Sequence, residues 1–354
     1  MAFTYVCPFC PLGCDDLPWG GNGDWAQIAE CERASAELAS FKHGTVARLH
    51  DRLIDDQSLV VDDFLRRLKL PAVPILSVNQ PTIEESKRLV DWLVQSRIRL
   101  SSAERDPSER AFANTIGRDG NVTATLGDVY RHAKSIWVLG DPDETFPRLN
   151  KQLDRLKATV VRSRQIDSLY LSRLSEPADW LLRDYVGIIV ASNAFAESEE
   201  TIAADLLSRL IAKLNAPLDD RRMRRAVAIR LSSDENLSSV MRWTTNHSLD
   251  RYSTDLAAHI QVGSPRRADF SARPPVKLQI GGIDFGPDAA DAYLPAGQPG
   301  IDLAGTTIRL DGSVTLPLTR QVETHLPSRG TLLGQVIASL SADSASPIET
   351  GNKR

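Results

Sequence analysis

Four cysteines, all within the first 31 residues, constrain this chain more than any other feature of its sequence. Cys7, Cys10 and Cys14 follow one another closely, and Cys31 comes later. No cysteine occurs in the remainder of the 354 residues, so disulfides cannot cross-link the larger part of the chain. Clustered cysteines without a secretory signal more often bind metal or do redox work. The spacing predicts a small metal-binding lobe at the N-terminus.

The pattern of these cysteines favours one kind of metal group. Three thiolates on a single tight loop serve three corners of a cubane iron–sulfur cluster, and a later segment supplies the fourth ligand. Zinc usually prefers two separated Cys-x2-Cys pairs. We therefore expect a 4Fe-4S cluster on Cys7, Cys10, Cys14 and Cys31, with a zinc site and a metal-free remnant as the alternatives.

Short apolar runs beyond the cysteines alternate with helix-like segments. The runs that read as strands are residues 73–78, 135–140, 158–161 and 186–190. Thr82 and Glu85 have the spacing of a capping box, which predicts a helix directly after the first strand. Alternation of this kind predicts an α/β fold with parallel sheets covered by helices.

A second helix is predicted at residues 201–215. Its apolar stripe is expected to be Ile202, Leu206, Leu210 and Leu214, which makes that face part of the core.

Changes in composition and in the predicted elements divide the chain into consecutive parts. We expect a cysteine-rich cluster-binding lobe at 1–60, α/β lobes at 61–265 and a β-rich part at 266–340. The last stretch, 341–354, is rich in small and polar residues, and we expect it to be a flexible tail.

Composition excludes several classes of partner. The apolar fraction is 42%, the charged fraction is 25% and the net charge is −4, which favours neither nucleic acid nor an anionic membrane surface. No window approaches the roughly 18 uncharged apolar residues of a membrane span. We therefore expect a cytoplasmic protein that binds neither nucleic acid nor membrane.

The cysteine segment also carries a family resemblance. Cys-Pro-Phe-Cys-Pro-Leu-Gly-Cys-Asp-Asp at 7–16 resembles the opening of the B-type chain of formylmethanofuran dehydrogenase, and Cys31-Glu-Arg-Ala resembles its fourth-cysteine motif. Further similar segments follow in the same order at 126–128, 137–142, 146–148, 236, 243–245, 294–301, 305–306 and 309–311. That family is similar to molybdopterin oxidoreductases, so the resemblance implies lobes of that type, a small N-terminal cysteine lobe and a β-rich C-terminal part.

One departure from the family decides the expected function. Its catalytic members carry a Cys-His pair after the first β–α unit, where the cysteine ligates molybdenum or tungsten. Here residues 100–108 contain neither type, and no histidine lies between His50 and His132. An oxygen ligand from Ser101, Ser102 or Asp106 is the alternative, but we expect a surface loop and no molybdenum or tungsten pterin.

The resemblance therefore implies a subunit without catalytic residues of its own. We expect a non-redox scaffold, the B-type subunit of a bacterial formyltransferase/hydrolase complex, whose partners are A-, C- and D-type subunits. Such complexes pass formyl groups from tetrahydromethanopterin to a methanofuran-like carrier and release formate. The alternatives are an active B-type chain of a formylmethanofuran dehydrogenase, with a metal pterin and an iron–sulfur cluster, and a zinc-stapled interaction protein.

Overall fold

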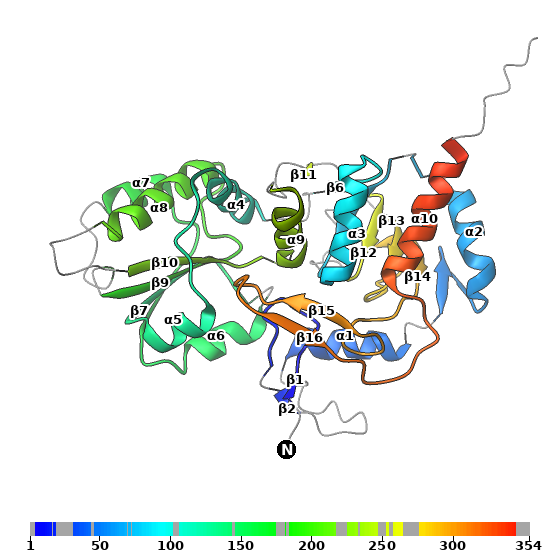
Figure 1. The fold of residues 1–354 in the computed structure, drawn as a ribbon, viewed down its shortest axis with the longest axis horizontal. Helices are drawn as coiled ribbons and strands as arrows, with labels where there is room; N and C mark the ends of the chain where they lie inside the picture. Colours follow the sequence, from blue (N-terminus) through cyan, green and yellow to red (C-terminus); the bar gives the residue numbers. More distant parts are fainter. Residues whose placement is uncertain are drawn as a thin grey trace, which may run out of the picture. The chain divides into compact units, whose positions relative to one another are not determined.

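The structure is a computed structural model of the whole chain (Figure 1). It describes residues 4–15, 17–18, 31–43, 46–68, 70–71, 73–101, 106–143, 146–174, 181, 184–216, 225–232, 234–246, 253–254, 258–264 and 276–344.

The chain forms two compact units, and each is assembled from separate stretches of sequence. The first unit comprises Met1–Ala34, Arg105–Arg251 and Thr306–Leu318. The second comprises Ser35–Glu104, Tyr252–Gly305 and Thr319–Arg354. The consecutive lobes expected from the sequence, with boundaries after residues 60, 265 and 340, stay a prediction.

The first unit contains a four-stranded parallel sheet with the strand order β10-β9-β7-β8. The strands are β7 (Ser135–Leu139), β8 (Thr159–Ser163), β9 (Tyr185–Val190) and β10 (Arg225–Arg230). Three of them lie where the apolar runs predicted them, and β10 was not predicted. Strands β7 and β9 are buried along their whole length, because they occupy the middle of the sheet.

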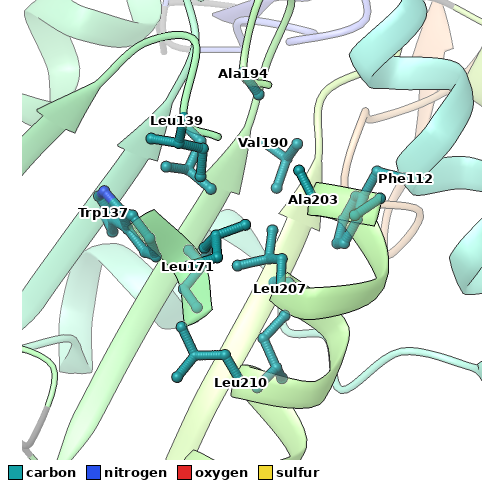
Figure 2. Packing of buried hydrophobic residues seen from close by; sticks show 14 of the residues in the cluster. Phe112, Trp137, Leu139, Leu171, Val190, Ala194, Ala203, Leu207 and Leu210 are labelled. Carbon is teal, nitrogen blue, oxygen red and sulfur yellow. The ribbon is translucent and has the colours of Figure 1, made fainter. Parts of the chain in front are cut away.

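Helices cover both faces of this sheet (Figure 1). One face carries α4 (Pro107–Asp119), α7 (Ser168–Arg173) and α8 (Glu200–Leu214), and the other carries α5 (Leu126–His132) and α6 (Pro147–Leu153). Figure 2 shows Phe112, Trp137, Leu171 and Leu207, which belong to the hydrophobic core between the sheet and the helices α4, α7 and α8. A further helix, α9 (Glu235–Thr245), follows β10.

Helix α8 buries a different face from the one predicted. Ile202 is 57% exposed and Leu206 is only partly buried. The residues of α8 that are buried are Ala203, Ala204, Leu207, Leu210, Ile211 and Leu214. The predicted stripe was wrong at its start because the prediction considered only large apolar side chains. The small side chains of Ala203 and Ala204 instead face the sheet and let the helix approach it closely.

The second unit contains an eight-stranded sheet with the order β11-β6-β5-β12-β13-β14-β3-β4. Its strands are β3 (Ala47–Leu49), β4 (Arg52–Ile54), β5 (Ile75–Val78), β6 (Arg99–Ser101), β11 (Ser253–Thr254), β12 (Ile260–Val262), β13 (Val276–Ile280) and β14 (Ala290–Leu294). Pairing is parallel from β11 to β14, and β3 and β4 add an antiparallel edge. Strands β13 and β14 come from the predicted β-rich part, yet they share a sheet with the early strand β5.

A buried row of polar side chains crosses this sheet. The register places Gln261 opposite Ser77 and Gln279, Gln279 opposite Tyr293, and Tyr293 opposite Arg48. Residues directly opposite one another point to the same face. Each of the five is at most 5% exposed, and backbone carbonyls of residues 281–283 accept hydrogen bonds from Gln279 and Tyr293. These buried polar contacts help to specify the register of the strands, which apolar side chains alone would specify less strictly.

The second unit also contains α2 (Gln57–Leu68), α3 (Ile83–Val94) and α10 (Arg329–Ser344). The predicted capping box is confirmed, because the Thr82 side chain accepts from Glu85 N–H and the Glu85 side chain accepts from Thr82 N–H. Helix α10 was not predicted. It extends to Ser344, four residues into the expected tail, while 345–354 lie outside the described residues.

The predicted α/β class with parallel sheets covered by helices is confirmed at this level. Two further sheets have two short strands each: β1 (Thr4–Tyr5) pairs with β2 (Leu17–Pro18), and β15 (Gly305–Ile308) pairs with β16 (Thr315–Leu318). Among the described residues, no helix is long and apolar enough to cross a membrane.

Candidate metal site

The first three cysteines lie on one closed loop between β1 and β2. Backbone N–H of Cys7 donates to the carbonyl of Cys14 at 2.9 Å, and N–H of Gly13 donates to the carbonyl of Cys10 at 3.1 Å. Gly13 has φ of +56°, and a Cβ there would lie 2.7 Å from Leu316 Cδ1. A glycine is therefore favoured in the turn that brings Cys14 back beside Cys7.

The loop is packed inside the first unit. Cys7, Cys10 and Cys14 are each less than one-tenth exposed, as are the apolar side chains of Phe9 and Leu12. Backbone N–H of Leu310, after strand β15, donates to the carbonyl of Pro11 at 2.8 Å. The hairpin formed by β15 and β16, called the C-terminal hairpin below, thus holds the cysteine loop in place.

Cys31 is half-buried and directly precedes α1 (Glu32–His43). Burial is the main cause that raises the pKa of the Cys7 thiol, and the charges of Cys10, Cys14 and Cys31 raise it further. Cys7 therefore interacts electrostatically with each of the other three cysteines. Their mutual repulsion as thiolates is what a bound cation would relieve.

Arg33 is a feature of this site that sequence reasoning did not single out. Burial raises the pKa of Cys10, and the positive charge of Arg33 acts against that rise. The signal was present in the sequence, because Arg33 stands two positions after Cys31. A guanidinium there offsets part of the negative charge that a cysteine-ligated group brings.

The donor chemistry fits a soft metal group, since thiolates suit zinc and iron–sulfur clusters. Within the described ranges, however, no group of three or more His, Cys, Asp or Glu side chains stands in an arrangement that would hold a metal ion. The assignment of Cys7, Cys10, Cys14 and Cys31 as cluster ligands accordingly stays a prediction.

Asp106, in the segment that corresponds to the Cys-His pair of the dehydrogenases, has a structural role. Asp106 is the N-cap of α4: its Oδ1 accepts from N–H of Ser108 at 2.9 Å and of Glu109 at 3.2 Å. Its Oδ2 accepts from N–H of Asn193 at 3.1 Å. With both oxygens bound to backbone donors, Asp106 does not fit the role of a metal ligand.

The surface loop expected at 101–108 was therefore wrong at both described ends, because residue 101 belongs to β6 and residues 106–108 form the N-cap and start of α4. Asp106 and Ser108 are buried, and Ser108 Oγ accepts from N–H of Phe195 at 3.0 Å. Ser101 is the last residue of β6, and Ser102 lies outside the described residues.

Two of the segments that resembled the family contact each other, and a third, Asn236, binds the residues between 305–306 and 309–311. Asp311 Oδ2 accepts from backbone N–H of Leu126 at 2.8 Å. The Asn236 side chain donates to Thr307 Oγ1 at 2.9 Å and accepts from backbone N–H of Ile308. These residues hold the C-terminal hairpin, and with it the cysteine loop, inside the first unit.

The fold has a counterpart among solved structures. A chain in the crystal structure of the formyltransferase/hydrolase complex from Methylorubrum extorquens with methylofuran superposes with a TM-score of 0.60. The match covers 85% of this chain and 100% of that chain at 15% sequence identity. No protein-family model matches the sequence, and no curated protein does. At this identity the likeness shows the fold.

Proposed function

We propose that this chain is a non-redox scaffold subunit, of the B type, in a formyltransferase/hydrolase complex. The fold likeness to a chain of such a complex supports the assignment, as do the motifs that resemble the related dehydrogenase chain in the same order. In this role the chain binds A-, C- and D-type subunits, which hold the chemistry of tetrahydromethanopterin-linked formyl transfer and formate release.

The single observation that carries the proposal is the state of Asp106. In a catalytic dehydrogenase chain this region supplies a metal ligand and a histidine. Here Asp106 caps a helix, and three backbone N–H groups occupy its carboxylate. No cysteine after Cys31 is available to replace the ligand. The chain therefore lacks the Cys-His pair of the dehydrogenases, and Asp106 does not replace its metal ligand.

The four cysteines have a structural task in this proposal. A 4Fe-4S cluster on Cys7, Cys10, Cys14 and Cys31 would stabilise the N-terminal loop, which contacts the C-terminal hairpin through Pro11 and Leu310. Without a second redox centre in the chain, such a cluster has no electron to relay.

The test is to purify the complex without oxygen through a tag on this chain. Iron, zinc, molybdenum and tungsten are then measured, the co-purifying subunits are identified, and formate release from the formyl carrier is assayed. About four irons per chain without molybdenum or tungsten, together with formate release that needs no electron acceptor, supports the scaffold.

Two other outcomes contradict the proposal in different ways. Molybdenum or tungsten near one atom per chain, with acceptor-dependent turnover, identifies an active dehydrogenase chain. One zinc per chain without formyltransferase partners identifies a zinc-stapled interaction protein.

A further inference from the structure

A pocket of about 500 Å³ lies in the first unit beyond the carboxyl end of strand β10. Its walls come from α4 and the segment after it, from α9, and from the turn between β15 and β16. This volume is within the range of small-molecule sites. The pocket plays no part in the proposed scaffold role, and the cysteines do not line it.

Arg230, the last residue of β10, lines this pocket with an incompletely satisfied side chain. The side chain is 13% exposed. Its nearest carboxylate oxygens are Glu235 Oε2 at 3.6 Å and Glu109 Oε1 at 3.9 Å, which are too far for hydrogen bonds. In the part of the chain that the structure describes, the guanidinium makes no hydrogen bond. A guanidinium has five N–H donors, so the Arg230 side chain has donors available to a ligand in the pocket.

Glu235 presents the complementary group beside it. Its Oε1 accepts from Ser239 Oγ at 2.7 Å and from Arg242 Nη2 at 3.0 Å, so that oxygen is satisfied. Its Oε2 has only the 3.6 Å approach of Arg230 among the described residues. The pocket wall therefore offers a fixed donor and a fixed acceptor next to each other, both mostly buried.

The surrounding charges argue against an ionic ligand. Among the charged side chains that line the pocket, Arg230 and Arg242 are balanced by Glu235 and Asp311, so neither an anion nor a cation gains net Coulomb attraction there.

Part of the remaining lining suits an apolar body. Ala113, Ile116, Ile229 and Leu310 line the pocket, and a Cβ added at Gly120 would meet nothing within 4 Å. A flat ring would find both contact and space there.

We propose that this pocket binds a neutral small molecule through an amide or lactam edge. The carbonyl oxygen of the ligand accepts from Arg230, the adjacent N–H donates to Glu235 Oε2, and a ring or alkyl body lies against Ile116 and Leu310. This pairing satisfies the Arg230 donor and the Glu235 acceptor at once, which neither a carboxylate nor an amidine achieves.

Three probes of nearly the same shape test the proposal on the unmodified full chain. Benzamide carries an acceptor and a donor, benzoate carries acceptors only, and benzamidine carries donors only. Binding is followed by NMR of isotope-labelled isoleucine methyl groups, because Ile116 and Ile229 line the pocket. We expect benzamide to shift both signals and to bind about tenfold more tightly than either ion. Equal or tighter binding of benzoate or benzamidine, or no shift with benzamide, overturns the proposal.

Variants then locate the interaction. Glu235→Gln should weaken benzamide binding and strengthen benzoate binding, because the two arginines lose their counter-charge. Arg230→Met should lower benzamide affinity by about tenfold or more. The matched control is Arg118→Met, an arginine on α4 that is 58% exposed and does not line the pocket, and it should bind benzamide normally.

If Arg230→Met does not fold, the Glu235 variant and the three-probe comparison decide the matter. An unchanged benzamide-to-benzoate ratio in Glu235→Gln would refute the donor–acceptor assignment. Because the scaffold proposal is tested by metal content and association with partner chains, either idea can fail without the other.

Discussion

The carboxylate of Asp311 binds the backbone N–H of Leu126, the first residue of α5, at a distance of 2.8 Å. The two residues are 185 positions apart in the sequence. A carboxylate at the first turn of a helix satisfies an N–H that lacks an intrahelical partner and complements the helix dipole. The turn between β15 and β16 is thereby attached to the sheet-covering helices of the first unit.

The pKa of Asp311 yields a prediction about acid stability. Burial alone would raise it, but hydrogen bonds from Ser313 and Leu126 and the charge of Arg309 outweigh burial and lower it. A carboxylate whose pKa is lowered by folding stabilises the protein above its unfolded pKa, about 3.9, and loses that effect as pH falls through the folded value.

Asp311→Asn should therefore lower the free energy of unfolding by about 2 kcal/mol near neutral pH. The difference from the unmodified protein should shrink as pH falls below about 5. Urea unfolding at a series of pH values measures this. The control is Asp154→Asn, whose side chain is 63% exposed, and it should show little difference at any pH. A difference for Asp311→Asn that does not change with pH would rule out the charged contact as its source.

A pair of glycine substitutions separates backbone strain from steric overlap. Gly140 has φ of +87° and Gly120 has φ of +81°, so alanine is strained at both, at a cost of about 1–3 kcal/mol. A Cβ at Gly140 would also overlap the carbonyl oxygen of Ser192, whereas a Cβ at Gly120 would meet no atom within 4 Å. Gly140→Ala should lose more than about 4 kcal/mol or fail to fold, while Gly120→Ala stays native. Thermal unfolding compares them, and equal losses would contradict the close approach of the loops after β7 and β9.

Glu85 has two structural roles that a conservative substitution separates. It closes the capping box of α3, and its two oxygens bind Arg329 Nε at 3.0 Å and Nη2 at 2.7 Å. Arg329 is 3% exposed, so loss of the charge leaves a buried guanidinium without its counter-ion. Glu85→Gln keeps an acceptor for Thr82 N–H but should cost about 3 kcal/mol in urea unfolding. Asp119→Asn, which removes one of the two carboxylate partners of the exposed Arg118, should change nothing measurable. Equal effects of the two substitutions would show that burial of the Arg329 pair does not matter.

The proposed scaffold role predicts which property a cysteine variant damages. Cys10→Ser preserves size, but a hydroxyl is a poor ligand for soft metal groups. We expect less metal per chain and a lower yield of assembled complex, with unchanged turnover per assembled complex. Thr315→Ser, at an exposed position of β16, is the control and should leave metal and yield unchanged. Normal yield with collapsed turnover would mean that the cysteines serve chemistry.

Local sequence signals predicted several elements correctly. Strands β5, β7, β8 and β9 lie at the apolar runs, and the capping box of Thr82 and Glu85 marks the start of α3. These features depend on residues close together in the chain, where periodicity and capping act directly.

Local sequence patterns failed to predict features that depend on contacts with distant segments of the chain. The Ile202 end of α8 is exposed because the sheet receives the face with Ala203 and Leu207 instead. Helix α10 has alternating small and apolar residues without a strong stripe, and its anchor is the contact of Arg329 with the earlier Glu85. Neither contact can be recognised from the hydrophobic pattern of the helix itself.

The sequence by itself determined the alternation of strands and helices and the grouping of the first three cysteines on one short loop, because short-range spacing encodes both. The tertiary structure alone decided which strands share a sheet, how Asp106 uses its oxygens, and that Arg230 and Glu235 stand side by side in a pocket. Those outcomes depend on pairing and burial between residues far apart in the chain, where the free energy of a contact exists only once both partners have been brought together.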